Sequence, residues 1–138
     1  MQSNDRGFTL LELLVVLAVV GLMSSLLLVY VKSVKNQATD NLVRSNLLSV
    51  RSQSAIYFDE VGNYDDFLTT PNTIQMKAVD AAGRASGGGW ASGDGPLGWY
   101  ARVQLKSKPG FSWCVDYLGN SKEVVTDATN PDDALACP

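Results

Sequence analysis

The sequence of 138 residues contains no histidine. The commonest general base, every Ser–His or Cys–His nucleophile pair and the commonest zinc ligand are therefore missing. Charged residues are scarce, at 18% against 46% apolar residues, which excludes a disordered or acidic-tail protein. The formal charge of −3 disfavours binding to nucleic acid through overall basicity. No pair of residues suggests catalysis, so we expect neither an enzyme nor a cofactor.

Charge is missing altogether between Glu12 and Lys32. The 19 residues from Leu13 to Val31 are almost all aliphatic, and about 20 apolar residues in a helix span the hydrocarbon core of a bilayer. A cleaved secretory signal fits poorly, because its apolar region is shorter and ends in a small-residue cleavage site. A plain single-pass anchor is an alternative. Glu12 argues against it, because an ionisable residue at the edge of a membrane span is costly and requires a partner.

The apolar run is preceded by the string RGFTLLE at residues 6–12. This string resembles the class III signal of type IV pilins and type II secretion pseudopilins. In that family a prepilin peptidase cuts after the glycine, and the new amino-terminal phenylalanine is N-methylated. The resemblance implies a leader peptide of residues 1–7, a cut between Gly7 and Phe8, and N-methylation of Phe8. It also implies an assembly role for Glu12, as the carboxylate that receives the Phe8 amine of a neighbouring subunit.

The same resemblance implies a location and partners. The chain would be a single-pass protein of the inner membrane with its head, residues 59–138, outside the cytoplasm. It would then enter an extracellular filament as one subunit of a helical homopolymer. The implied partners are prepilin peptidase, an inner-membrane assembly platform and membrane lipid, with no direct binding of nucleic acid. A type IV pilus-like subunit is the preferred function. A pseudopilin of a type II secretion or DNA-uptake system, and a membrane-anchored binding module, are the alternatives.

The helical pattern continues beyond the apolar run. Residues 33–58 contain neither proline nor glycine, and apolar side chains such as Val43, Leu47 and Val50 recur at spacings of three and four. We therefore predict one helix with a transmembrane and assembly half, residues 8–31, and an amphipathic half, residues 32–58. The segment Asp59–Tyr64, which contains Gly62, is typical of a helix stop.

The head begins with an ambiguous segment, in which residues 73–79 fit either a strand or a helix. Residues 81–98 contain seven glycines with no G-K-[ST] sequence behind them, which predicts a flexible loop rather than a phosphate-binding loop. Apolar and polar residues then alternate over 99–125, with turns at 108–110 and 118–120, which predicts an antiparallel meander of three or more strands. The expected fold is α+β and pilin-like: a long amino-terminal helix packed on a small carboxy-terminal antiparallel sheet.

The two cysteines, Cys114 and Cys137, match no metal-binding spacing. Downstream of a membrane segment, a disulfide formed in an oxidising compartment is the simplest interpretation, with two unpaired thiols as the alternative. The bond would tie the tail, residues 126–138, to the sheet. The tail also holds weak calcium candidates, namely Asp127, Asn130, Asp132 and Asp133. Their spacing does not match a twelve-residue calcium loop, and Asn-Pro-Asp also suits a turn, so we expect no metal.

The head carries six basic and eleven acidic residues, a net charge of −5. Such a head repels DNA as a whole. Arg102, Lys106 and Lys108 are the candidates for a local basic patch on a fibre. The carboxylates lie in predicted loops, where we expect them to be solvated.

Overall fold

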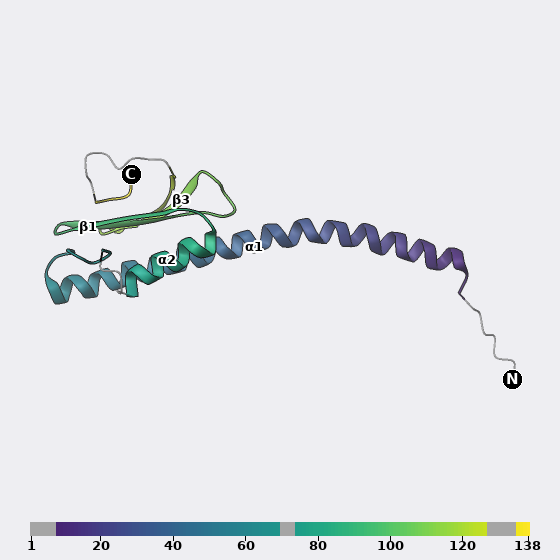
Figure 1. The fold of residues 1–138 in the computed structure, drawn as a ribbon, viewed down its shortest axis with the longest axis horizontal. Helices are drawn as coiled ribbons and strands as arrows, with labels where there is room; N and C mark the ends of the chain where they lie inside the picture. The colour runs from purple at the N-terminus through teal and green to yellow at the C-terminus, as the bar shows by residue number, and fades with distance from the viewer. Residues whose placement is uncertain (1–7, 70–73, 127–134) are drawn as a thin grey trace, which may run out of the picture. The chain divides into compact units, whose positions relative to one another are not determined.

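The structure is a computed structural model that describes residues 8–69, 74–126 and 135–138. The chain contains two compact units, one up to Lys35 and one from Asn36 to Pro138. Helix α1, Leu10–Val61, belongs to both, and the second unit adds helix α2, Ile74–Ser86. Four strands complete the second unit: β1 (Trp90–Gly95), β2 (Gly98–Gln104), β3 (Phe111–Asp116) and β4 (Ser121–Val125) (Figure 1). The predicted α+β class, a long helix with an antiparallel sheet, is confirmed.

Helix α1 ends where the sequence predicts a stop, three residues later than the predicted boundary at residue 58. Gly62 adopts a φ of 82°, and its amide donates to the Phe58 carbonyl at 2.8 Å. Such a left-handed glycine directly after a helix satisfies one of the last carbonyls and turns the chain away. The chain then enters the short loop 62–69.

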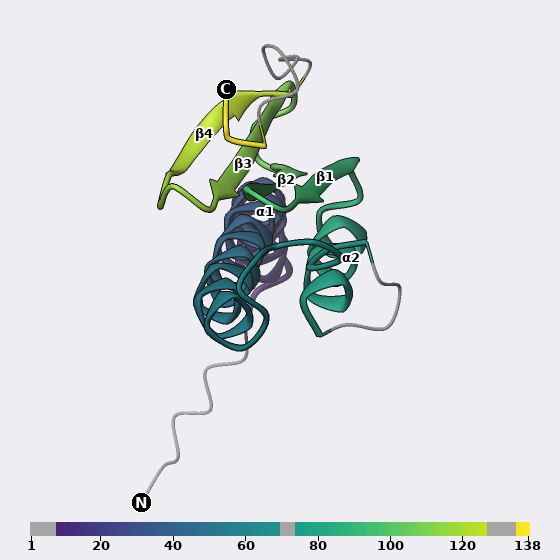
Figure 2. The ribbon, with the colours of Figure 1, turned by 90° about the vertical axis from the view of Figure 1, so that its left-hand side faces the viewer.

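The sheet is an antiparallel meander in the order β1-β2-β3-β4. Three of these strands, β2, β3 and β4, coincide with the alternation that predicts them, within two residues at either end. The turns between them contain Gly110 and Gly119, both in the left-handed region. Figure 2 shows α1 and α2 side by side beneath the same face of the sheet, with α2 under the β1 edge.

The prediction of a flexible loop over residues 81–98 is wrong. The carboxy-terminal half of α2 and all of β1 occupy this segment. Helix α2 is rich in alanine, the best helix former, and this outweighs its one glycine. That glycine, Gly83, lies against Trp90: a Cβ added at Gly83 would lie 2.4 Å from the Trp90 ring atom Cδ1. Strand β1 forms because the two-residue turn at Pro96 and Leu97 folds it back on β2, with Gly95 opposite Gly98.

The main core lies between the helices and the sheet. Val43, Leu47 and Val50 of α1 are buried there against Trp99 and Phe67, whose rings lie 5.1 Å apart. These α1 residues are the ones that the spacing of three and four predicts. Other apolar positions of α1 in this unit, including Leu42 and Ile56, are about half exposed. The helix therefore buries a narrower stripe than the sequence pattern indicates.

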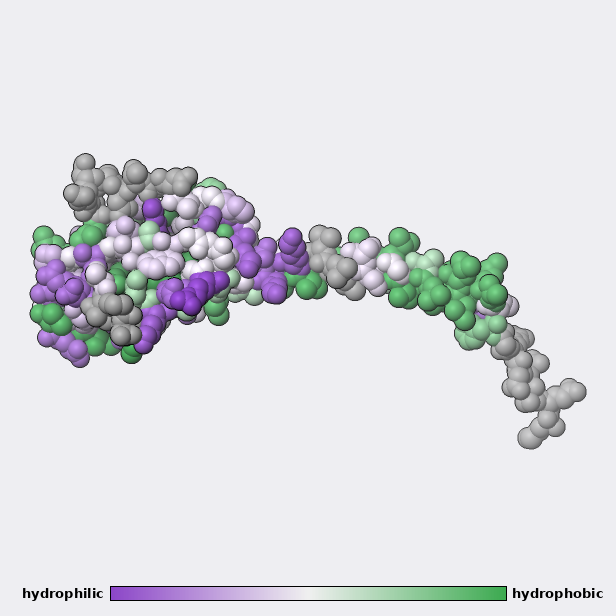
Figure 3. Space-filling view, viewed as in Figure 1, coloured by the Kyte–Doolittle hydropathy of each residue, from purple (hydrophilic) through white to green (hydrophobic). Residues whose placement is uncertain are grey.

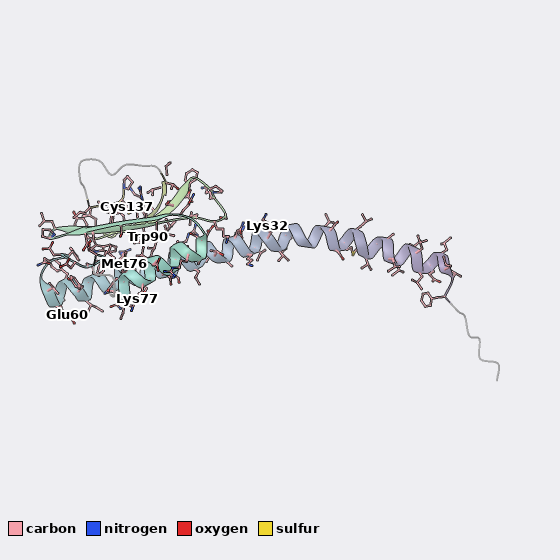
Figure 4. All side chains as sticks on the ribbon, viewed as in Figure 1. Lys32, Glu60, Met76, Lys77, Trp90 and Cys137 are labelled. Atoms are coloured by element: carbon pink, nitrogen blue, oxygen red, sulfur yellow. A yellow bond between two sulfur atoms is a disulfide. The ribbon has the colours of Figure 1, made fainter. Side chains whose placement is uncertain are left out.

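A second, smaller core covers the opposite face of the sheet. It contains Cys114 on β3, Val124 on β4 and Cys137 of the tail, with the half-buried Tyr100 beside them. Cys114 and Cys137 form a disulfide, and Cys137 lies at the face of the sheet that points away from the helices (Figure 4). Because side chains are buried on both faces, the sheet is the middle layer of this unit.

Two aspartates hold the ends of the main core in place. Each accepts hydrogen bonds from backbone amides of a distant loop or turn. Asp40 on α1 is 3% exposed and accepts bonds from the amides of Lys106 (2.6 Å) and Ser107 (3.1 Å), and from the Ser107 hydroxyl. Asp94 on β1 accepts bonds from the Leu68 amide and the Thr69 hydroxyl. Asp40 thus fixes the β2–β3 turn on α1, and Asp94 fixes the loop after α1 on the sheet edge.

A third aspartate, Asp116, is completely buried at the end of β3. Its carboxylate accepts bonds from the Asn120 amide (2.9 Å), the Asn120 side chain (2.7 Å) and the Cys137 amide (2.9 Å). Our expectation that the head carboxylates are solvated in loops is therefore wrong for Asp116. A carboxylate that accepts several amide bonds can be buried, because these bonds replace its water.

The Asp40 bonds lead to a stability prediction. We expect Asp40→Ala to lower the free energy of unfolding by about 2 kcal/mol, because two amides of the β2–β3 turn lose their buried, charged acceptor. Denaturant unfolding of the full chain in detergent, read by tryptophan fluorescence, measures this change. The matched control is Asp59→Ala, at an exposed aspartate of the same helix, which should change the value by less than about 0.5 kcal/mol. Equal losses in the two variants would contradict the role given to Asp40.

Candidate processing and assembly segment

The segment around the predicted cleavage point starts outside the described residues, since Gly7 lies there. Phe8 is the first described residue, and its side chain is 78% exposed. Thr9 follows, and α1 begins at Leu10. A peptide bond on the amino-terminal side of Phe8 is thus next to exposed, non-helical backbone, as a protease site requires.

Thr9 caps the amino terminus of α1. Its hydroxyl accepts a bond from the Glu12 amide at 3.3 Å, and its carbonyl accepts one from the Leu13 amide. Thr9 and Glu12 therefore stand at the two ends of a capping-box sequence, Thr-x-x-Glu, directly before an apolar run. This cap was not predicted from the sequence, although the Thr-x-x-Glu motif indicates it. The cap uses the backbone amide of Glu12 and not its carboxylate.

Glu12 lies in the first turn of α1 and its side chain is exposed. A negative charge there is favoured by the helix dipole, by about 0.3–1 kcal/mol at an exposed site. Phe8 lies four residues earlier in the chain. The amine that a cut after Gly7 would create therefore stands close in sequence to this carboxylate, but on backbone that precedes the helix.

The apolar half of α1 presents its side chains outward. Leu13, Leu17 and Leu22 are each more than half exposed, and Figure 3 shows hydrophobic surface along the amino-terminal part of the helix. By length and composition, α1 is the one helix among the described residues that could cross a membrane. Ser24 and Ser25 donate their hydroxyls to the carbonyls of Val20 and Leu22, both at 2.8 Å, so these two polar residues do not interrupt the helix.

The remaining candidate residues do not form one site. Arg102 is on β2 opposite Cys114, whereas Lys106 and Lys108 lie in the β2–β3 turn, where Lys108 pairs with Glu123. The calcium candidates Asp127, Asn130, Asp132 and Asp133 lie outside the described residues. Within the described ranges, no group of three or more histidine, cysteine, aspartate or glutamate side chains could hold a metal ion.

Tyr57 lies beside three aspartates, two of them in the loop after α1. The Tyr57 hydroxyl donates to the Asp65 carbonyl. Burial raises the pKa of Tyr57, and the charges of Asp66, Asp94 and Asp65 raise it further. The hydroxyl is therefore protonated at neutral pH and can keep this bond.

The long amino-terminal helix and the four-stranded antiparallel meander, with its carboxy-terminal disulfide, form a pilin-like α+β fold. Residues 2–28 match the family described as the prokaryotic N-terminal methylation motif. This motif is the class III prepilin signal typical of type IV pilins and pseudopilins. No curated protein and no solved structure matches the chain.

Proposed function

We propose that this protein is a structural subunit of an extracellular type IV pilus-like filament. The observation that carries the proposal is the methylation motif at residues 2–28, which ends inside the apolar half of α1. The pilin-like fold of the C-terminal unit supports it. The motif is shared by pilins and by the pseudopilins of secretion and DNA-uptake systems, so a pseudopilus is the alternative filament.

Maturation begins with prepilin peptidase in this proposal. The enzyme hydrolyses the peptide bond between Gly7 and Phe8, which releases the leader of residues 1–7 and leaves a free amine on Phe8. That amine is then N-methylated and stays cationic. The cut also removes Arg6 and Asp5, so that the mature chain begins four residues before Glu12.

The new amine and Glu12 set the register of assembly. Opposite charges 4 Å apart attract by about 4 kcal/mol at an effective dielectric constant of about 20. That attraction offsets the cost of bringing the Glu12 carboxylate into an apolar bundle. A subunit in the wrong register would leave a carboxylate unpaired among apolar side chains, and such an arrangement is strongly unfavourable.

Subunit association uses the exposed apolar half of α1. Before assembly, lipid covers the side chains from Leu13 to Val31; in the filament, the same half of neighbouring helices covers them. Helices in lipid associate through close packing and polar contacts rather than through exclusion of water. An inner-membrane assembly platform would extract each subunit from the bilayer, with the C-terminal unit on the oxidising side where the disulfide forms.

The mass of the mature protein tests this proposal. We expect the intact protein and its amino-terminal peptide, isolated from the native host, to begin at Phe8 with a methylated amine. Gly7→Ala should keep its leader, which makes it the matched control for the cleavage site. A wild-type chain that begins at Met1 or Gln2 would contradict the proposal. It would instead support a permanently anchored binding module.

A further inference from the structure

An exposed apolar surface lies at the end of the C-terminal unit where α1 stops. We call it the tip patch; its members come from α1, the β1–β2 turn and the β3–β4 turn, and they are Phe58, Val61, Leu97, Tyr117 and Leu118. Leu97 is 83% exposed and Leu118 is 63% exposed. Exposed apolar side chains gathered on adjacent turns form a candidate contact surface.

Ring contacts and a shared pocket connect the three elements of the tip patch. The Tyr64 ring lies 4.9 Å from the Phe58 ring and 6.2 Å from the Tyr117 ring, which joins α1 to the β3–β4 turn. Leu97 and Tyr117 line the same shallow pocket, together with Leu135 of the tail. One partner surface can therefore contact all three elements at once.

Three exposed acidic residues lie around the tip patch, against one arginine, Arg51, whose guanidinium lies beside Gly119 of the β3–β4 turn. Asp59, Glu60 and Asp65 are all exposed. Asp59 and Glu60 stand in the last turn of α1, where the helix dipole disfavours negative charge. Within the described part of the chain, neither of them forms an ion pair. Figure 4 shows Glu60 directed outward at this end of α1. The charge that would complement this surface is thus positive.

The other end of the same unit carries the complementary surface, around the β2–β3 turn. We call it the base patch; its members are Lys106, Lys108, Pro109, Phe111 and Val125. The Lys108 ammonium lies 4.6 Å from the centre of the Phe111 ring, Phe111 is opposite Val125 in the sheet, and Val125 is 54% exposed. Lys106 is exposed and, among the described residues, has no ion pair. Because Glu123 pairs with Lys108, the base patch combines apolar area with the positive charge of Lys106.

The tip patch and the base patch cannot meet within one molecule. Asp40 holds the β2–β3 turn against α1, and Val61 lies 21 residues further along the same helix, which is about 30 Å. Strand β2 likewise runs from the β1–β2 turn to the β2–β3 turn. Two complementary surfaces at opposite ends of one body fit a contact between copies of that body, in which each copy uses both surfaces.

We infer that the tip patch binds the base patch of a second copy of this chain, head to tail. The inference rests on the proposed filament and names one contact within it. A head-to-tail contact uses different surfaces on its two partners and therefore extends into an open filament when the rotation does not close. The apolar members exclude water, and the acids and lysines fix the polarity of the stack.

Charge reversal tests the contact. We expect Glu60→Lys and Lys106→Glu each to lower the yield of sheared filaments by about fivefold or more, because each places like charges opposite one another. The double variant should return to within about twofold of wild type, because the charges are again opposite. Lys77→Glu, at an exposed lysine of α2 outside both patches, is the matched control and should leave the yield unchanged. No loss in the single variants, or no recovery in the double variant, would overturn the inference.

A photo-cross-linking experiment tests this contact independently of the filament proposal. Leu97 is replaced by photo-reactive benzoylphenylalanine in the full chain in its native membrane, and the product is mapped by mass spectrometry. We expect a dimer joined to residues 106–111 of a second copy, whereas the same group at Ile74, which is 75% exposed on α2, should give none. A product with a different protein alone, or no product, would overturn the contact. A head-to-tail dimer of chains that still begin at Met1 would support the contact and contradict the filament.

Discussion

Glu12→Gln is expected to lower the yield of extracellular filaments about tenfold or more, while membrane insertion and cleavage after Gly7 continue. Glutamine keeps nearly the shape of glutamate and is accepted at the same position of a capping box. The variant therefore keeps the cap formed by Thr9 but removes the charge that would receive the Phe8 amine. Quantitation of sheared filaments against the processed membrane pool measures the effect.

The comparison with Glu12→Ala makes this prediction specific, because alanine removes both the charge and the side chain of the capping box. If the charge sets the register, the glutamine and alanine variants lose filaments to the same extent. If Glu12 acts only through the helix cap, the glutamine variant assembles like wild type and the alanine variant alone is impaired. The latter result would contradict the register mechanism.

Removal of the disulfide is expected to have the largest effect on folding. The bond joins residues 23 positions apart, and closing such a loop stabilises the folded state by about 3 kcal/mol in the chain-entropy model. We expect the double variant Cys114→Ser and Cys137→Ser to lose this amount. Denaturant unfolding of the full chain in detergent, followed by tryptophan fluorescence, gives the value.

The wild-type protein under a reducing agent is the matched control, because it loses the bond but keeps both side chains. We expect its unfolding midpoint to fall to that of the double serine variant, while the double serine variant itself does not respond to the reductant. A reduced wild type as stable as the oxidised protein would show that the rest of the fold holds the tail without the bond.

Much of this fold can be predicted because several segments repeat apolar residues at the spacing of a helix or of a strand. The uncharged run before Lys32, the spacing of Val43, Leu47 and Val50, and the alternation along β2 and β3 each identify one element. Gly62 marks the end of α1 for a local reason, its left-handed backbone. These signals depend on neighbouring residues in the chain, so the sequence alone is sufficient to locate them.

The segments that could not be predicted depend on contacts distant in sequence. Strand β1 contains two glycines and has little tendency of its own to form a strand; pairing with β2 stabilises it. Gly83 interrupts an alanine-rich stretch, yet the position requires a glycine because Trp90 lies against it. Asp40 and Asp116 look like surface carboxylates until the turns that donate amide bonds to them are in place.

Asp116 helps to position the two cysteines that form the disulfide. Its carboxylate accepts a bond from the amide of Cys137, next to the β3 strand that bears Cys114. Formed ahead of the disulfide, this bond would hold the tail thiol beside its partner and raise the effective concentration of one thiol at the other. In the proposed membrane pool of identical subunits, a thiol held in this way would be oxidised with the partner thiol of its own chain in preference to a thiol of a neighbour. Under the proposed function, this buried carboxylate would limit random covalent cross-linking between neighbouring subunits.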